Sequence, residues 1–171
     1  MNNPNYEVKA TNYIEEHKEL AIVEMYRSGI PASITMAQAL HESNFGSSEL
    51  AKNANNHFGI KCKSYWEGGT YFHEDDDYDS AGKLMESCFR AYDSVYDSYI
   101  DHSNFLVNTR YYRDLFNYDK TDYVSWAVGL QKAGYATDPN YAKKLISLVK
   151  KYDLDILDTM EDPLRKLREL D

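Results

Sequence analysis

The chain has no long apolar run. Its 171 residues contain no stretch of about 18 consecutive apolar residues, so the sequence predicts no membrane-spanning helix. The first residues, Met1 to Glu7, contain neither a basic start nor an apolar stretch, and we expect no signal peptide in this chain. Internal repeats, low-complexity segments and linkers are also absent, which favours a single domain of ordinary size.

Basic residues are fewer than acidic ones. Lys and Arg number 19 against 28 Asp and Glu, which gives a formal net charge of −9. Binding to a nucleic-acid backbone depends on Lys and Arg that displace counterions from the phosphates, so we expect no nucleic-acid partner. The hydrophobic share of 43% is typical of a folded globular domain and argues against a disordered chain.

Cysteine is rare, whereas tyrosine is abundant. Cys62 and Cys88 either form one disulfide or remain thiols, and without a CxxC pair the sequence predicts no structural zinc site. The 16 Tyr are accompanied by 6 Phe and 2 Trp. A phenol combines an apolar face with a hydroxyl that forms hydrogen bonds, which suits a sugar-binding groove and equally an ordinary packed surface.

Hydrophobic periodicity predicts a mainly helical fold. Apolar residues three and four positions apart indicate helices over residues 11–28, 31–43, 94–107, 121–133 and 139–152. A short helix is expected over 47–53. The pattern changes over 70–77 and 85–91, where we expect the two strands of a β-hairpin. After Asp158, leucines at helical spacing predict a short amphipathic helix that docks on the core or on a neighbouring protein.

Glu42 lies at the end of a mostly apolar predicted helix. Partial desolvation there favours the neutral form of the carboxyl group and raises its pKa. A glycosidase needs such a group as the general acid that protonates the leaving oxygen. For an isolated glutamate, however, a solvated helix end is the more frequent interpretation.

Two predicted loops complete the candidate site. The loop around Asn56 and Phe58 offers side-chain amides that suit sugar hydroxyl and acetamido groups. In the other loop, Gly134 permits an unusual backbone conformation and Tyr135 is able to point a phenol into a cleft. Each loop is also compatible with ordinary turn chemistry.

The order of these segments is more specific than any one of them. The string AQALHESNFGSS at 37–48 closely resembles a motif of the glucosaminidase family of bacterial cell-wall hydrolases, which is glycoside hydrolase family 73 and includes autolysins and flagellar peptidoglycan hydrolases. Four further blocks resemble those of the family in the same order: NHFGIK at 56–61, FRAYDS at 89–94, DHSNFL at 101–106 and GYATDP at 134–139. The resemblance spans residues 11–153.

The resemblance implies a mainly α (α+β), lysozyme-like helical domain with a small β-hairpin lobe beside the cleft. It implies a catalytic domain over 1–157, followed by a short helical tail over 158–171. The implied activity is that of an endo-β-N-acetylglucosaminidase, which hydrolyses the β-1,4 bond after N-acetylglucosamine in peptidoglycan glycan strands. No metal or organic cofactor is implied. Since peptidoglycan lies outside the cytoplasmic membrane, we expect action in the periplasm, the cell wall or the extracellular space, alone or within a larger phage or secretion assembly.

The resemblance also implies catalytic residues. The family's general acid falls on Glu42, and Tyr135 falls on a tyrosine that we expect to position the substrate or support the transition state. The second carboxylate lies on the hairpin, where counting along the chain favours Asp76, then Asp77, then Glu74. It would activate a water or stabilise oxocarbenium charge, unless the 2-acetamido group of the substrate assists instead. An acidic tip that only aids solubility, or a weak cation site, is the alternative interpretation of this cluster.

Substrate binding is expected from Phe45, Asn56 and Phe58, and from the hairpin residues Asp77 and Glu74. Phe45 stands where the family often has Trp, and we expect it to support the helix end or a sugar face. Two other functions remain open at this stage. The first is a muramidase or lytic transglycosylase on the same scaffold, and the second is a catalytically idle glycan-binding module of a phage particle or secretion machine.

Overall fold

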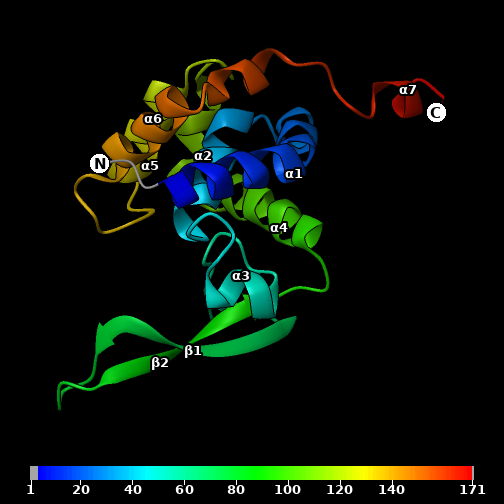
Figure 1. Cartoon of the computed structure of the whole chain (residues 1–171). Helices are drawn as coiled ribbons and strands as arrows, with labels where there is room; N and C mark the ends of the chain where they lie inside the picture. The colour runs from blue at the N-terminus through cyan, green and yellow to red at the C-terminus, as the bar shows by residue number, and fades with distance from the viewer. Residues whose placement is uncertain (1–3, 171) are drawn as a thin grey trace.

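The computed structural model describes residues 4–170, except the side chains of Asp76, Asp77 and Arg168. A helical body carries a two-stranded hairpin that projects from one side of it (Figure 1). The expected mainly helical fold with a small hairpin lobe is thereby confirmed. Among the described residues, none of the helices has both the length and the apolar character needed to cross a bilayer.

The elements follow the chain in an order close to the expected one. They are α1 (Pro4–Ser28), α2 (Ala32–Glu42), α3 (Glu49–Ala54), β1 (Gly69–Tyr78), β2 (Leu84–Ala91), α4 (Val95–Asn108), η1 (Arg110–Asn117), α5 (Tyr123–Lys132), α6 (Tyr141–Lys151), η2 (Leu154–Thr159) and α7 (Arg165–Arg168). The helix α1 begins at Pro4, earlier than periodicity indicated. The sequence also did not predict the two 3₁₀ helices, η1 and η2.

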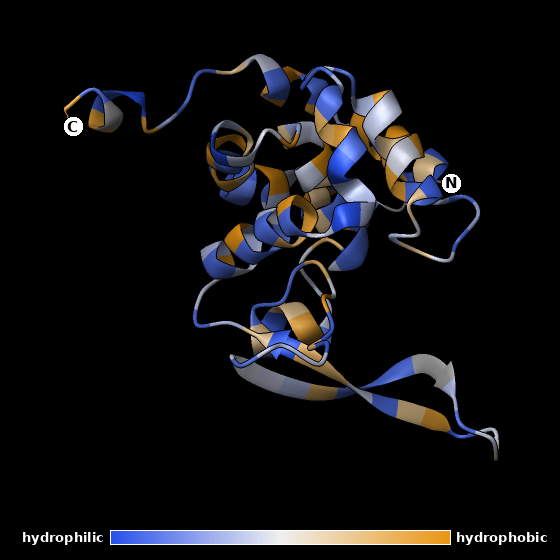
Figure 2. Cartoon of the chain, turned by 180° about the vertical axis from the view of Figure 1, so that it is seen from behind, coloured by the Kyte–Doolittle hydropathy of each residue, from blue (hydrophilic) through white to orange (hydrophobic). Residues whose placement is uncertain are grey.

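The helix α2 lies at the centre of the helical body. Every residue from Ala32 to Leu40 is buried, and the helix packs against α1, α6 and η2. Four of these residues, Ala32, Ser33, Ala37 and Ala39, are small, which lets the surrounding helices approach closely. Figure 2 shows the apolar residues gathered where the helices face one another. A helix that is buried over nine consecutive residues therefore carries Glu42 at its end.

A carboxylate from η2 holds the first turn of α2. The Ser33 amide donates a hydrogen bond to Asp158 Oδ1 at 2.7 Å, and the Ser33 hydroxyl donates to Oδ2 at 2.6 Å. Asp158 is the first residue of the expected tail, yet it is 1% exposed. The chain therefore stays packed on the helical body as far as this residue. Burial raises the pKa of Asp158 to about 6, although both hydrogen bonds favour the charged form.

The hairpin is regular near the body and irregular beyond it. The strands pair antiparallel in register as far as Glu74, and pairing resumes at Tyr78. Residues 75–77 lie opposite one residue of β2, Met85, so the strand bulges there. The bulge holds most of the acidic run that includes the candidate second carboxylates.

Two contacts fix the base of the hairpin. Cys62 and Cys88 form a disulfide, which decides between the two states that the sequence left open. Arg90 of β2 donates from Nη1 to Asp101 of α4 at 2.9 Å, and the Arg90 side chain is 3% exposed. The strand end that meets the helical body is therefore held by one covalent and one ionic contact.

The C-terminal segment extends away from the body (Figures 1 and 2). The helix α7 has four residues, and Leu167 and Leu170 are 63% and 82% exposed. Of the two predicted alternatives, docking on the core is therefore wrong, whereas docking on a neighbouring protein stays a prediction. Its leucines have the spacing of an amphipathic helix, but the apolar side faces solvent.

We expect the double variant Cys62→Ser/Cys88→Ser to unfold with a free energy about 2–4 kcal/mol lower than the wild type, because the disulfide restricts the unfolded chain. Equilibrium denaturation of the two proteins measures the difference. The wild type in the presence of a reductant serves as the control and should show the same loss. Identical denaturation midpoints for the variant and the oxidised wild type would contradict this expectation.

Candidate active site

Glu42 is placed by the way in which α2 ends. Residues 44–46 all adopt positive φ angles, of 48°, 58° and 80°. The amide of Phe45 donates to the carbonyl oxygen of Leu40 at 2.9 Å, which closes the last turn of the helix. This left-handed turn stops α2 directly after Glu42 and leaves the carboxyl group facing a cleft.

The cleft has a volume of about 410 Å³ and lies between the helical body and the base of the hairpin lobe. Its walls come from the end of α2, the segment 58–63, the helices α4 and η1, and the loop after α5. The lining residues are Glu42, Phe58, Gly59, Ile60, Lys61, Lys63, Phe105, Tyr112, Gly134, Tyr135, Ala136 and Thr137. Aromatic faces beside a carboxyl group suit a sugar ring and its hydroxyl groups.

Burial raises the pKa of Glu42 to about 7. One hydrogen bond opposes this shift, because the Tyr141 hydroxyl donates to Glu42 Oε1 at 3.3 Å and favours the charged form. The backbone of Gly59 passes close to the other oxygen. A Cβ atom at Gly59 would lie 3.7 Å from Oε2, and its φ of +66° favours glycine. Glu42 therefore holds a proton near neutral pH in a place that a ligand can reach.

Gly134 and Tyr135 fulfil the geometric expectation for their loop. Gly134 has a φ of +84°, and the amide of Tyr135 donates to the carbonyl oxygen of Leu130 at 3.0 Å, which ends α5. The turn brings Tyr135 into the cleft wall, where its ring stacks on Tyr141 with centroids 5.7 Å apart. Burial raises the pKa of Tyr135 well above its ordinary value, so its phenol stays protonated. It is suited to hydrogen bonding and not to proton transfer.

The structure separates the roles of Asn56 and Phe58. Phe58 lines the cleft, although only 2% of it is exposed, and its ring stacks on His102 at 3.9 Å. Asn56 is 1% exposed, and its amide nitrogen donates to the carbonyl oxygens of Ile60 and Arg90 at 3.0 and 2.9 Å. Its side chain holds the loop to the hairpin, and this geometry does not support the predicted contact with sugar.

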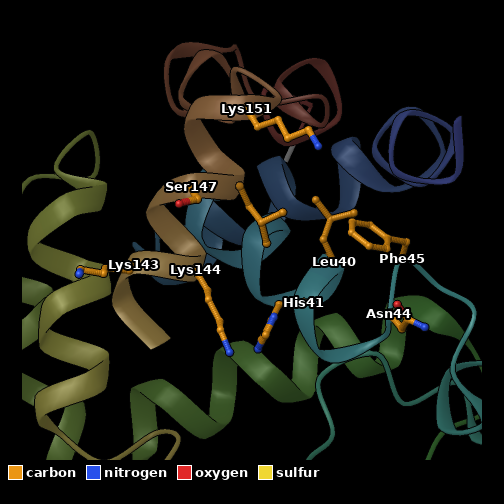
Figure 3. Close-up of a pocket in the computed structure, with 9 residues that line it drawn as sticks. Leu40, His41, Asn44, Phe45, Lys143, Lys144, Ser147 and Lys151 are labelled. Carbon is orange, nitrogen blue, oxygen red and sulfur yellow. The ribbon is translucent and has the colours of Figure 1, made fainter. Parts of the chain in front are cut away.

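Phe45 lies in a neighbouring hollow of about 590 Å³, between the end of α2 and α6 (Figure 3). The hollow is lined by Leu40, His41, Asn44, Phe45, Lys143, Lys144, Ser147, Leu148 and Lys151. The Phe45 ring is 5.9 Å from that of Tyr6, and it packs against the core. Phe45 thus packs at the end of α2, which agrees with one of its two predicted roles, and it does not share the Glu42 cleft.

The hairpin carboxylates are only partly described. Glu74 is exposed. Asp76 and Asp77, the first two candidates for the second carboxylate, have side chains that lie outside the described part of the chain. Sequence reasoning passed over Asp75, which forms an ion pair with Lys61 on the cleft wall and accepts a hydrogen bond from Ser87 at 3.3 Å. This ion pair links β1 to a residue of the cleft wall, although none of the described hairpin residues lines the cleft itself.

Sequence reasoning also missed Tyr141, which contacts Glu42 directly, and Gln38, which donates to the Tyr141 hydroxyl at 3.0 Å. A signal for Gln38 was present, because residues four apart on a helix share a face and Gln38 precedes Glu42 by four positions. Tyr141 lies 99 positions after Glu42 in the chain, and no local pattern joins the two.

The fold and the cleft are those of a lysozyme-like domain with a carboxyl group of raised pKa at the end of its central helix. The family model described as "Mannosyl-glycoprotein endo-beta-N-acetylglucosaminidase" matches residues 18–154. The chain therefore belongs to the glucosaminidase family, which confirms the resemblance seen in the sequence.

Relatives and solved structures agree with this assignment. The chain is 38% identical over 141 residues to the exo-glucosaminidase LytG of Bacillus subtilis, covering 79% of this chain and 49% of LytG. It is 32% identical over 129 residues to the peptidoglycan hydrolase FlgJ of Salmonella typhimurium, covering 72% of this chain and 40% of FlgJ. The chain thus spans half or less of these two relatives.

Among solved structures, the catalytic domain of the autolysin Auto from Listeria monocytogenes has a TM-score of 0.77 at 28% identity, with 92% of this chain and 90% of that chain covered. The glycoside hydrolase domain of Salmonella typhimurium FlgJ has a TM-score of 0.67 at 28% identity, with 84% and 88% covered. The match extends over nearly all of each solved domain, so the chain corresponds to the catalytic domain in both.

The raised pKa of Glu42 predicts how the stability of Glu42→Gln depends on pH. The Glu42 pKa is about 7 in the folded wild type, against an ordinary value of 4.5, so the free energy of unfolding of the wild type rises as the pH falls from about 7 to 4.5. Gln does not titrate, so the free energy of unfolding of the variant minus that of the wild type is expected to be larger at about pH 8 than at about pH 5. Denaturation of both proteins across this range measures the difference, and a constant difference would refute the pKa shift.

Proposed function

We propose that this protein is a peptidoglycan hydrolase, an endo-β-N-acetylglucosaminidase that cleaves the β-1,4 bond after N-acetylglucosamine. The observation that carries the proposal is Glu42, a carboxyl group with a pKa raised to about 7 in an aromatic cleft. Membership of the glucosaminidase family supports the same activity. So do the printed functions of LytG and FlgJ, an exo-glucosaminidase and a peptidoglycan hydrolase.

Glu42 acts as the general acid. Its proton passes to the glycosidic oxygen as the bond from that oxygen to the anomeric carbon breaks, and water supplies the hydroxyl group that the anomeric carbon gains. The remaining proton of that water is taken by the second carboxylate and then restores the acid form of Glu42. Burial keeps the acid protonated before this step. After the step Glu42 is charged, and the hydrogen bond from Tyr141 then stabilises the carboxylate.

Tyr135 positions the sugar beside Glu42. Its ring forms part of the cleft wall with Phe105 and Tyr112, and its protonated phenol is able to hydrogen-bond to substrate. Aromatic faces of this kind bury the apolar side of a sugar ring while leaving its hydroxyl groups free to bond. Phe58 lines the same cleft.

The second catalytic group is a carboxylate of the hairpin, with Asp76 as the first candidate, followed by Asp77 and Glu74. It holds the attacking water or stabilises positive charge at the anomeric carbon. The ion pair of the adjacent Asp75 with Lys61 supports this role, because it ties the strand that carries the acidic run to a residue of the cleft wall. The candidates that do not act directly are proposed to bind substrate.

The site of action follows from the substrate. Peptidoglycan lies outside the cytoplasmic membrane, so the protein works in the periplasm, the cell wall or the extracellular space. Because the chain spans half or less of LytG and FlgJ, a larger assembly or further domains around this catalytic unit remain part of the proposal.

The first test is mass spectrometry of borohydride-reduced products from purified peptidoglycan, with Glu42→Gln as the control. New reducing ends on N-acetylglucosamine that the variant does not produce are expected. Reducing N-acetylmuramic acid would instead identify a muramidase, and anhydro ends a lytic transglycosylase. Products of mixed length from early times indicate endo cleavage, whereas release of single end units would show an exo enzyme. No cleavage of several wall types would favour a binding module.

A second test separates the hairpin carboxylates. Asp76→Asn is expected to lower kcat by about 100-fold or more, since a positioned acid or base typically contributes this much. Glu86→Gln is the matched control, because Glu86 is an exposed acid on β2 opposite Glu74. A comparable loss in Asp77→Asn or Glu74→Gln, with Asp76→Asn near wild type, would move the role to that residue.

A further inference from the structure

A chain of buried hydrogen bonds leads from α4 to Glu42. His102 Nε2 lies 2.8 Å from Gln38 Oε1, Gln38 Nε2 lies 3.0 Å from the Tyr141 hydroxyl, and that hydroxyl lies 3.3 Å from Glu42 Oε1. His102, Gln38 and Tyr141 are each 0% exposed. Three elements, α4, α2 and α6, therefore meet in one polar line inside an apolar core.

The donors and acceptors in this line have one consistent direction. Burial lowers the pKa of His102 to about 3, so the ring is neutral and carries one N–H. Because the Gln38 carbonyl oxygen only accepts, that N–H is on Nε2. The Gln38 amide then donates to the Tyr141 oxygen. The single proton of the Tyr141 hydroxyl is left to donate to Glu42.

A different amide orientation would reverse this outcome. If Gln38 turned its amide nitrogen toward a bare Nε2 of His102, its carbonyl oxygen would face Tyr141 and accept the phenol proton. Glu42 would then lose its donor. The tautomer of His102 thus selects the direction in which the Tyr141 proton points, although His102 touches neither Glu42 nor the cleft surface directly.

Packing alone does not account for a histidine at this position. His102 Nδ1 is buried and has no hydrogen-bond partner within the described part of the chain. An unsatisfied buried nitrogen lowers stability, and an aromatic ring without it would still stack on Phe58, whose ring is 3.9 Å away. The hydrogen bond from Nε2 to Gln38 is what a purely apolar ring would not supply.

We propose that His102 and Gln38 are positioning residues that hold the Tyr141 hydroxyl as a donor to Glu42. The proposal rests on the proposed function only for the role of Glu42 as general acid. The line favours the carboxylate form of Glu42 and so stabilises the charge that appears when the acid gives up its proton. The other titratable groups that line the cleft with Glu42 are Lys61, Lys63, Tyr112 and Tyr135.

The test is a titration of Glu42 that does not depend on activity. The full chain is labelled with ¹³C at glutamate side-chain carboxyl carbons, and the Glu42 signal is identified by its absence in Glu42→Gln. Tyr141→Phe is expected to raise the pKa of Glu42 by about one unit, which corresponds to the loss of one hydrogen bond. His102→Phe, which keeps an aromatic ring against Phe58, is expected to raise it in the same direction.

The double variant His102→Phe/Tyr141→Phe decides the matter. If His102 acts through Tyr141, the double variant titrates like Tyr141→Phe alone, because the second change has nothing left to remove. An unchanged Glu42 pKa in His102→Phe, or equal shifts in both backgrounds, would overturn the proposal. His17→Phe is the control, as another buried histidine, and should leave the Glu42 titration unchanged while it perturbs packing.

Gln38→Met keeps the test decisive if His102→Phe fails to fold. It removes the middle of the line with little change in volume and leaves the Tyr141 hydroxyl free to turn, with Glu42 still its acceptor. The Glu42 pKa is therefore expected to rise by less than in Tyr141→Phe, and an unchanged value would overturn the proposal. Kinetics on solubilised peptidoglycan then add the functional readout, in which the alkaline limb of kcat moves with the titration. Absence of cleavage by the wild type would reject the proposed function, whereas the NMR titration would still judge the hydrogen-bonded line.

Discussion

Asp158 accepts two hydrogen bonds from Ser33 in the first turn of α2, and this contact secures a helix that is buried from Ala32 to Leu40. Water does not reach most of α2, so its polar side chains depend on partners from other elements. Ser33 forms hydrogen bonds with Asp158, and Gln38 forms them with His102 and Tyr141. A rotation or slide of α2 would break these contacts together. Since Glu42 ends the same helix, its position is set by the packing of the whole helical body.

The burial that positions Glu42 also makes it reactive. Desolvation raises its pKa to about 7, while the hydrogen bond from Tyr141 acts in the opposite direction. A carboxyl group with burial alone would hold its proton too strongly, and one with several donors would release it well below neutral pH. The two effects place it where a proton is both present and transferable near neutrality. Stability is lost at this site, and the surrounding core compensates for it.

Local patterns predicted much of this fold, and long-range contacts explain most of what they missed. Apolar spacing predicted α2, α4 and α6, and Gly134 predicted the turn that presents Tyr135, because these features depend on near neighbours. The ordered family blocks pointed to Glu42 as the candidate general acid. By contrast, the line from His102 to Glu42 joins residues of three helices, and the bulge at 75–77 depends on how β1 pairs with β2. The leucines of α7 show the opposite error, since helical spacing alone does not specify a surface to pack on.

The two groups expected to carry the chemistry are held by very different supports. Glu42 is fixed by a central helix, whereas the acidic run belongs to a two-stranded ribbon held at its base by the Cys62–Cys88 disulfide. A two-stranded ribbon has little stability of its own, so its outer part gains order from what it touches. Along β1, His73 pairs with Glu49 of α3, and Asp75 pairs with Lys61 on the cleft wall. These contacts determine how the ribbon lies against the body. The ion pair between Asp75 and Lys61 is therefore a physical link between the hairpin and the segment 58–63 that lines the Glu42 cleft.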